Sequence, residues 1–167
     1  MEAPLTQIHA LWIRPGSVSP DEIPSSVTRF QEVDGPTQVL LSAGGPPAPA
    51  GWAGFALRHA HAPKLVPDLG RSPFLLAVRV VAAESDRAEF RRWLHEEHAR
   101  LQVSLDGVNW FLGYEEEGAA HSFLNLWGID APTIVDGGAW AEIRDTPRWR
   151  RVAHVTEDAD RGVYRAG

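Results

Sequence analysis

Short runs of apolar and β-branched residues alternate with turn-forming segments along most of the chain. Runs of the strand type lie at residues 7–13, 37–42, 52–58, 74–82, 109–115, 122–128 and 162–165. Gly and Pro crowd the segment 43–51, and prolines punctuate the connection 59–72. The pattern therefore predicts a strand at each apolar run and irregular structure in these two segments.

Helical patterns are clearest in the second half of the chain. Ser85 can cap a helix that runs to about Leu101, and a second helix, continuous or broken, is expected over 131–155. In the first half, a short helix that begins at Ser19 is interrupted at Pro24.

The order of the predicted elements indicates the fold class. Residues 73–167 read β–α–β–β–α–β, which is the order of a ferredoxin-like unit. Residues 1–72 read as strand, weak helix, strand, strand, and we interpret them as a degenerate copy. We expect an α+β fold in which these two halves form one compact domain, a dimeric or tandem α/β barrel.

Composition and charge narrow the class of protein. The 167 residues are 44% hydrophobic and 23% charged, which is typical of a folded domain. No cysteine is present, which excludes disulfides and thiolate chemistry. A net charge of −6 argues against broad nucleic-acid binding, and the basic run 148–151 is interpreted as a solvated helix face.

The chain has no apolar run near the ~20 residues that cross a bilayer, and Met1–Arg14 does not resemble a signal peptide. We therefore expect a cytoplasmic protein with neither a membrane nor a nucleic acid as partner. Seven tryptophans are many for this length. Most are expected in the core, and a surplus suits an aromatic-lined pocket.

Several short stretches of residues 74–167 together form a loose pattern. They are Phe90, Trp93, Glu97-His98, Asp106-Gly107-Val108, Ala139-Trp140, Thr146-Pro147-Arg148-Trp149 and 161–165. In these stretches, residues 74–167 resemble the EthD-like members of the dimeric α/β-barrel superfamily. The resemblance implies two four-stranded sheets paired into a barrel, either between the subunits of a homodimer or within one chain. It also implies aromatic or polyketide-like ligands, with cyclisation, isomerisation, decarboxylation or cofactor-free oxidation as activities.

The helix expected before Leu101 carries the strongest candidate for chemistry. His98 lies four residues after Leu94 and three before Leu101, so it shares their apolar face. An imidazole there could relay a proton to or from an enolisable substrate, with Glu97 as a second base or as the group that orients it. The alternative is a core histidine beside a surface carboxylate, while His95 falls on the wetter side.

No cofactor or metal is expected. His95 and His98 could share an ion only with a third ligand, for which His59, His61 and His121 are candidates by type alone. The motifs of zinc proteases, dinucleotide folds, phosphate loops and nucleophile elbows are absent from the sequence. A single histidine could also ligate haem, and nothing in the sequence favours it.

Two further strands offer candidate binding residues. Trp110 and Tyr114 share one face of the strand 109–115, and Asn125 lies between Phe123 and Trp127 on the next strand. Tyr114 could donate a proton, and Asn125 could bond to a ligand carbonyl. A structural role is the alternative for each. With Trp93, these residues complete the predicted site, in which His98, Glu97 and Tyr114 are catalytic and Trp93, Trp110, Asn125 and Trp127 bind substrate.

The leading hypothesis is an enzyme that uses metal-free acid/base chemistry on an aromatic or polyketide-like molecule, as a cyclase, isomerase, dehydratase or decarboxylase. A non-catalytic binding or accessory protein and a cofactor-free monooxygenase are the alternatives.

Overall fold

The computed structural model describes residues 7–15, 27–43, 51–61, 72–116 and 122–167. In the first half these residues form the strands β1 (Gln7–Ile13), β2 (Val27–Glu32), β3 (Gln38–Ala43) and β4 (Ala53–His61). The helix predicted to begin at Ser19 lies outside the described residues. The strand β2 was not predicted, because Phe30 is its one buried apolar residue and Arg29 is exposed.

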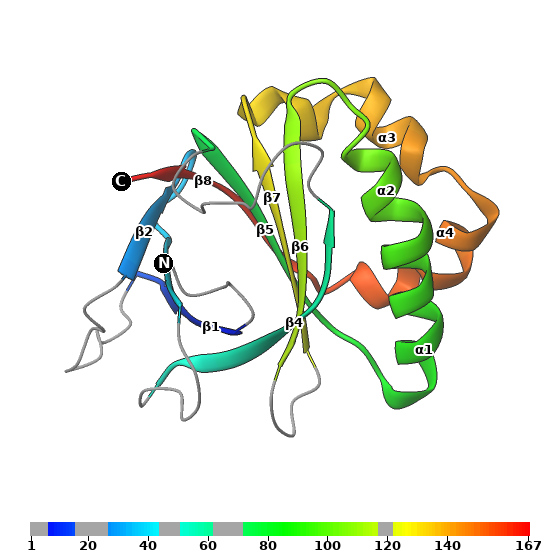
Figure 1. Ribbon diagram of the computed structural model, residues 1–167, viewed down its shortest axis with the longest axis horizontal. Helices are drawn as coiled ribbons and strands as arrows, with labels where there is room; N and C mark the ends of the chain where they lie inside the picture. The colour runs from blue at the N-terminus through cyan, green and yellow to red at the C-terminus, as the bar shows by residue number, and fades with distance from the viewer. Residues whose placement is uncertain (1–6, 16–26, 44–50, 62–71, 117–121) are drawn as a thin grey trace.

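The second half follows the predicted β–α–β–β–α–β order. Two helical segments, residues 84–102 and 132–156, connect its four strands, and both pack on one side of the sheet (Figure 1). In chain order the elements are β5 (Phe74–Val81), α1 (Glu84–Trp93), the π-helix η1 (Leu94–His98), α2 (Ala99–Gln102), β6 (Val108–Glu116), β7 (Ser122–Ile129), η2 (Pro132–Asp136), α3 (Gly138–Arg144), α4 (Pro147–Val152), η3 (Ala153–Thr156) and β8 (Asp160–Ala166).

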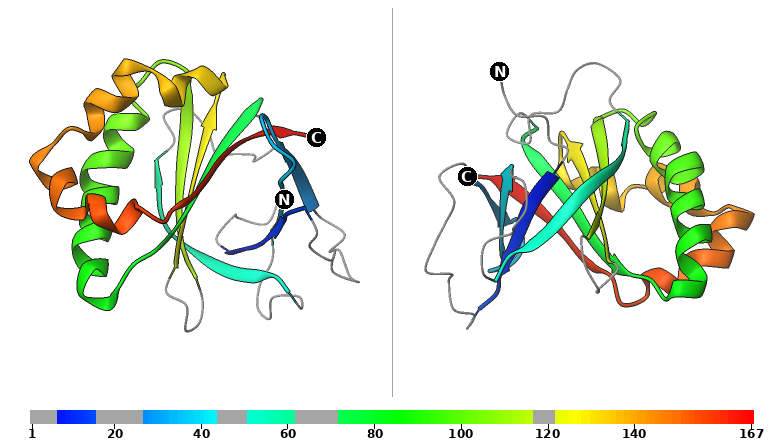
Figure 2. Two further views of the ribbon diagram at one scale, coloured as in Figure 1. Left: turned by 180° about the vertical axis from the view of Figure 1, so that it is seen from behind. Right: turned by 60° about the horizontal axis from the view of Figure 1, so that its bottom comes forward.

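The strands close into a barrel within this one chain, in the order β1-β3-β2-β8-β5-β7-β6-β4. The two halves meet at two antiparallel pairs, β2 with β8 and β4 with β6 (Figure 2). Within each half, the first strand lies between the third and the fourth, so both halves repeat one strand order. We propose on this basis that residues 1–72 and 73–167 are two ferredoxin-like halves. A second copy of the chain is not needed to close the barrel.

Two hydrophobic cores share the strands of the second half. One fills the barrel and includes Phe30 and Phe55 from the first half with Leu112 and Leu126 from the second. The other lies between the outer face of the same sheet and the helices. Alternate residues of a strand point to opposite faces, so each strand of this sheet contributes to both cores.

The first helical segment, residues 84–102, differs from its prediction in three ways. The helix begins at Glu84 after Ala83, so Ser85 lies inside the first turn and does not cap it. Residues 94–98 form a π-helix, whose wider turn rotates the following side chains relative to an α-helix. Leu101, predicted on the buried face, is 39% exposed, whereas His98 is buried as predicted.

Gly128 offers a test of this packing. It pairs with Trp110 across β6 and β7, and a Cβ at Gly128 would overlap the indole of Trp110 and the hydroxyl of Ser72. We expect Gly128→Ala to lower the free energy of unfolding by about 1–3 kcal/mol in urea titrations, since overpacking forces neighbours to move.

Gly138 is the matched control, because a Cβ there would meet nothing within 4 Å. Gly138→Ala should change the unfolding free energy by less than about 1 kcal/mol. Equal stability of the two variants would contradict the close approach of Trp110 to β7.

Candidate active site

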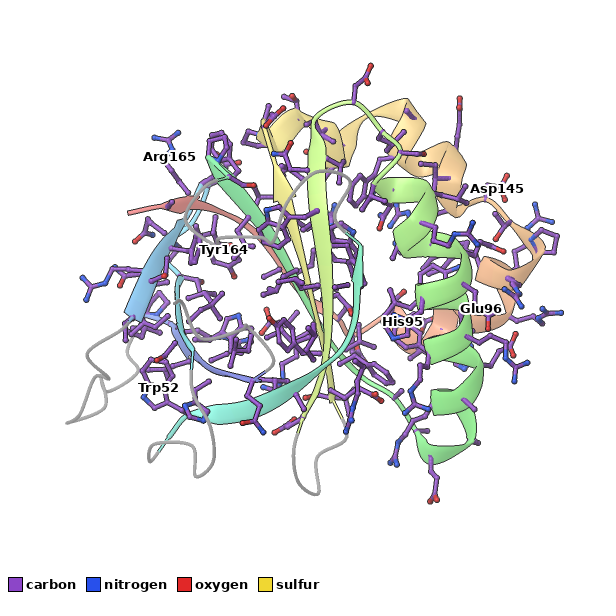
Figure 3. All side chains as sticks on the ribbon, in the orientation of Figure 1. Trp52, His95, Glu96, Asp145, Tyr164 and Arg165 are labelled. Carbon is purple, nitrogen blue, oxygen red and sulfur yellow. The ribbon has the colours of Figure 1, made fainter. Side chains whose placement is uncertain are left out.

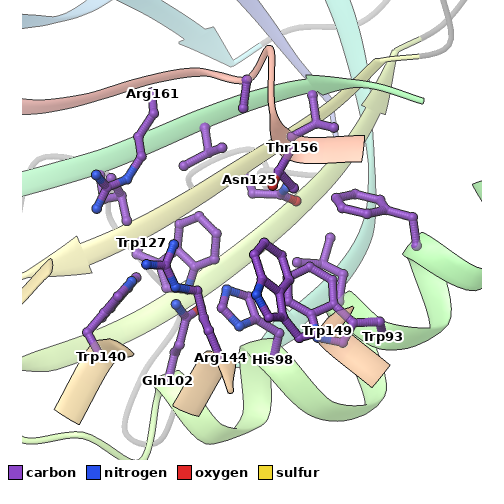
Figure 4. Close-up of a pocket in the computed structure, with 16 residues that line it drawn as sticks. Trp93, His98, Gln102, Asn125, Trp127, Trp140, Arg144, Trp149, Thr156 and Arg161 are labelled. Atoms are coloured by element: carbon purple, nitrogen blue, oxygen red, sulfur yellow. The ribbon is translucent and has the colours of Figure 1, made fainter. Parts of the chain in front are cut away.

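A cavity that is partly open to solvent lies between the outer face of the second-half sheet and the helices (Figure 4). Its empty space, counted together with the open solvent at its mouth, is about 560 Å³. Its floor comes from β5 and β7, and its walls come from α1, η1, α2, α3, α4, η3 and β8. Residues at its surface are Leu76, Val78, Val80, Phe90, Trp93, Leu94, His98, Gln102, Asn125, Trp127, Trp140, Arg144, Trp149, Thr156, Ala159 and Arg161.

Aromatic rings form most of the wall around His98. The ring of Trp93 stacks on the imidazole at a centroid distance of 4.3 Å, and Trp127 meets it edge-on at 6.1 Å. Trp149 lies 5.0 Å beyond Trp93, and Trp140 lies 6.0 Å from Trp127. This lining suits a flat aromatic ligand, because ring faces and edges offer large apolar contacts.

The end of the π-helix holds His98 against the sheet, where the residue is only 6% exposed. Burial, and then the positive charge of Arg144, lower the pKa of His98 to about 3. The imidazole is therefore neutral at pH 7. Its Nδ1 atom has no hydrogen-bond partner among the described residues.

Other polar atoms of the cavity share this property. Within the described part of the chain, both amide atoms of Gln102, Oδ1 of Asn125 and Nε1 of Trp127 are buried and have no hydrogen-bond partner. Leaving such a group unbonded costs about 1–3 kcal/mol. They therefore supply donors and acceptors for a ligand that carries carbonyl or hydroxyl groups.

Two arginines bring positive charge to the cavity. Arg144, the last residue of α3, places its guanidinium 5.7 Å from the ring centroid of Trp149. Arg161, near the start of β8, donates a hydrogen bond to the carbonyl oxygen of Val135 at 3.4 Å. Burial and the nearby Arg144 lower the pKa of Arg161, while Asp136 opposes this shift.

The structure brings together four of the predicted site residues, Trp93, His98, Asn125 and Trp127, at this cavity. Glu97 does not line it. Its carboxylate accepts a hydrogen bond from the hydroxyl of Thr146, which caps α4 by accepting from the backbone N of Trp149 at 3.1 Å. Glu97 thus fixes the start of the helix that carries Trp149.

Tyr114 and Trp110 lie on the other side of the sheet, in the core that fills the barrel. Their side chains alternate with Phe111, which faces the helices, so the strand places them away from the cavity. Burial raises the pKa of Tyr114 well above its usual range, and the phenol is neutral. The structure therefore gives these two residues no contact with a ligand in the cavity.

His95 also departs from its predicted position on the wetter side of the helix. It is half-buried, and its ring lies 6.3 Å from that of Phe111 on the sheet, whereas Glu96 points outward (Figure 3). Among the described residues, no group of three or more His, Asp or Glu could hold a metal ion. His121 lies outside the described residues, as do the side chains of His59 and His61.

Sequence reasoning missed several residues of the cavity, chiefly Gln102, Trp140, Arg144 and Arg161. Gln102 follows His98 by four residues, and Arg144 follows Trp140 by four, so helical spacing could have grouped each pair. No comparable signal joins the strand residue Arg161 to them, because only the closing of the sheet brings it there.

No family model matches this sequence, and no curated protein matches it. Solved structures share its fold. An anthrone oxidase-like protein has a TM-score of 0.64 at 10% identity, with 96% of this chain and 90% of that chain covered. A ferredoxin-fold protein from Listeria monocytogenes, uncharacterized and related to antibiotic biosynthesis monooxygenases, has a TM-score of 0.62 at 8% identity, covering 97% and 95%. The heme-degrading enzyme LmHde from Listeria monocytogenes has a TM-score of 0.59 at 8% identity, covering 96% and 99%.

At such identities these likenesses show the fold alone. They confirm the predicted α+β, ferredoxin-like barrel and do not confirm the EthD-like resemblance. Within the described residues, no helix has the length and apolar character needed to span a membrane.

The lowered pKa of His98 predicts a pH-dependent stability. Below about pH 6.5 the unfolded chain binds a proton at His98 that the folded chain refuses until about pH 3. The free energy of unfolding should therefore fall as pH falls. Relative to His98→Gln, the wild-type protein should lose about 2 kcal/mol between pH 7 and 5 in urea titrations.

His154→Gln provides the control, since it removes an exposed histidine that pairs with Asp86. The carboxylates also contribute a slope to the pH profile of this variant. The comparison of His154→Gln with His98→Gln therefore isolates the contribution of His98. If wild-type and His98→Gln proteins have parallel profiles over this range, His98 is not held neutral by burial.

Proposed function

We propose that this chain is a small-molecule enzyme that moves a proton on a planar aromatic substrate bound between the sheet and the helices. The observation that carries the proposal is the buried imidazole of His98, with an unbonded Nδ1, in an aromatic cavity. A neutral imidazole has a free lone pair that can accept a proton, and general-base catalysis typically gains a factor of about 10²–10⁴.

The neighbouring groups suit an enolisable substrate. His98 would take a proton from a carbon next to a carbonyl group, and the electron pair would move to the carbonyl oxygen as an enolate. The Nε2 amide of Gln102 and Nε1 of Trp127 can donate hydrogen bonds to that oxygen, and Oδ1 of Asn125 can accept one from a hydroxyl. The positive charge of Arg144 favours the enolate as it forms.

The imidazole is a weak base in the free cavity because its pKa is lowered to about 3. The developing enolate places a negative charge beside it, which favours the imidazolium form. Proton transfer and charge development therefore support each other. This step begins the reactions expected of a cyclase, isomerase or dehydratase. In a decarboxylase, loss of CO₂ would form the enolate instead, and the proton would then be added to its carbon. We keep polyketide-like compounds among the proposed substrates and the EthD-like family as a proposed relationship.

A second candidate follows from the structural neighbours, which include an anthrone oxidase-like protein and a monooxygenase-like protein from Listeria innocua. The same enolate could react with molecular oxygen. For anthrone the balance is one substrate and one O₂ to one anthraquinone and one water. The methylene carbon is oxidised, one oxygen atom enters the product, and the other leaves as water.

Anthrone distinguishes these functions in one set of measurements. In D₂O without oxygen, NMR follows exchange of its methylene protons, and with oxygen an electrode follows uptake. We expect the protein to speed exchange above the buffer rate and His98→Gln to reduce this gain by about 100-fold or more. His154→Gln changes an exposed histidine that does not line the cavity, and it should behave as wild type.

Exchange with no oxygen uptake supports acid/base chemistry alone, and enzyme-dependent uptake supports the oxygenase. Anthrone bound in equilibrium dialysis but not exchanged faster than in buffer would indicate a non-catalytic binding protein. Exchange that His98→Gln leaves unchanged would contradict the role of His98.

A further inference from the structure

We propose that Arg144 and Arg161 form an anion subsite that binds the carboxylate of an aromatic acid. The proposal rests on the proposed function, because it assigns a second chemical group to the substrate of the same cavity. Both side chains line the cavity. Figure 4 shows them arriving from opposite sides, Arg144 from the helices and Arg161 from the strand, with their guanidinium groups toward one another.

Arg144 and Arg161 combine two features, because they line the cavity and lack an ion pair among the described residues. Eight of the arginines that the structure describes pair with a carboxylate, as Arg91 does with Glu115 and Arg148 with Glu96. The other described arginines without an ion pair do not line the cavity; they are Arg29, Arg87, Arg100 and Arg165. None of the ion pairs among the described residues includes Arg144 or Arg161.

Two like charges that face one another repel, and the effect of Arg144 on the pKa of Arg161 reflects this repulsion. Asp136 relieves part of it at Arg161, without a described ion pair. An anion between the two guanidinium groups would remove the repulsion. A guanidinium also matches a carboxylate in shape, because two parallel N–H groups can bond to its two oxygens.

The surroundings favour an aromatic acid over a free inorganic anion. Trp149 lies under the guanidinium of Arg144, and Trp127 and Trp140 line the same cavity. A ring held by these walls would present its carboxylate to the arginines. The anion would also offset the positive charge that Arg144 exerts on His98, and so make the imidazole a stronger base.

Isothermal titration calorimetry with 2-naphthoate and 2-naphthamide tests this subsite, because the two probes share one ring and differ in charge. We expect wild-type protein to bind the carboxylate roughly tenfold more tightly than the amide or better. Arg144→Gln and Arg161→Gln should each remove most of this preference and change amide binding less than threefold.

Arg150→Gln is the matched control, since Arg150 is an exposed arginine that pairs with Asp145 outside the cavity. It should leave the preference intact. A measurement without substitution supports the same test: raising the salt concentration should weaken 2-naphthoate binding and leave 2-naphthamide binding nearly unchanged.

The outcomes separate this proposal from the proposed function. If both probes bind equally to wild type, the anion subsite is wrong, while the aromatic cavity and the role of His98 stand. Tight binding of inorganic phosphate with no binding of either naphthyl probe would contradict both, because the arginines would then serve an anion without the aromatic walls.

Discussion

Burial of β7 on both faces is the constraint on which the rest of the structure depends. All its residues from Ser122 to Ile129 are buried. Leu124 and Leu126 point into the barrel, whereas Phe123 and Trp127 meet the helices. A sheet with two apolar faces needs a cover on each. The first half of the chain closes the barrel over one face, and the helices of the second half cover the other.

These two covers differ in how completely they pack, and the difference places the site. The barrel interior is filled by side chains from both halves, including the large rings of Tyr114 and Tyr164. On the helix side, the π-helix and the broken helices from 132 to 156 leave a cavity beside His98. Several of its buried polar atoms have no hydrogen-bond partner among the described residues, and its two arginines have no ion pair there. A π-turn of this kind is often associated with functional sites.

The sequence predicted the strands of the second half and the burial of His98, because local periodicity reports which face of an element is apolar. It did not predict β2, whose single buried residue, Phe30, leaves too weak a pattern. It placed Tyr114 and Trp110 in the site because alternation groups residues by face and does not say which face the cavity adjoins. Arg161 was missed for the related reason that its neighbours on α3 come near it only in the closed fold.

A crystal structure with bound 2-naphthoate tests the central claim most directly, namely that the ligand site lies between the sheet and the helices. The account predicts the naphthyl ring beside His98 and Trp127, on the outer face of β7. A ring found inside the barrel, next to Tyr114 and Leu112, would contradict it and move the site to the opposite face of the same sheet.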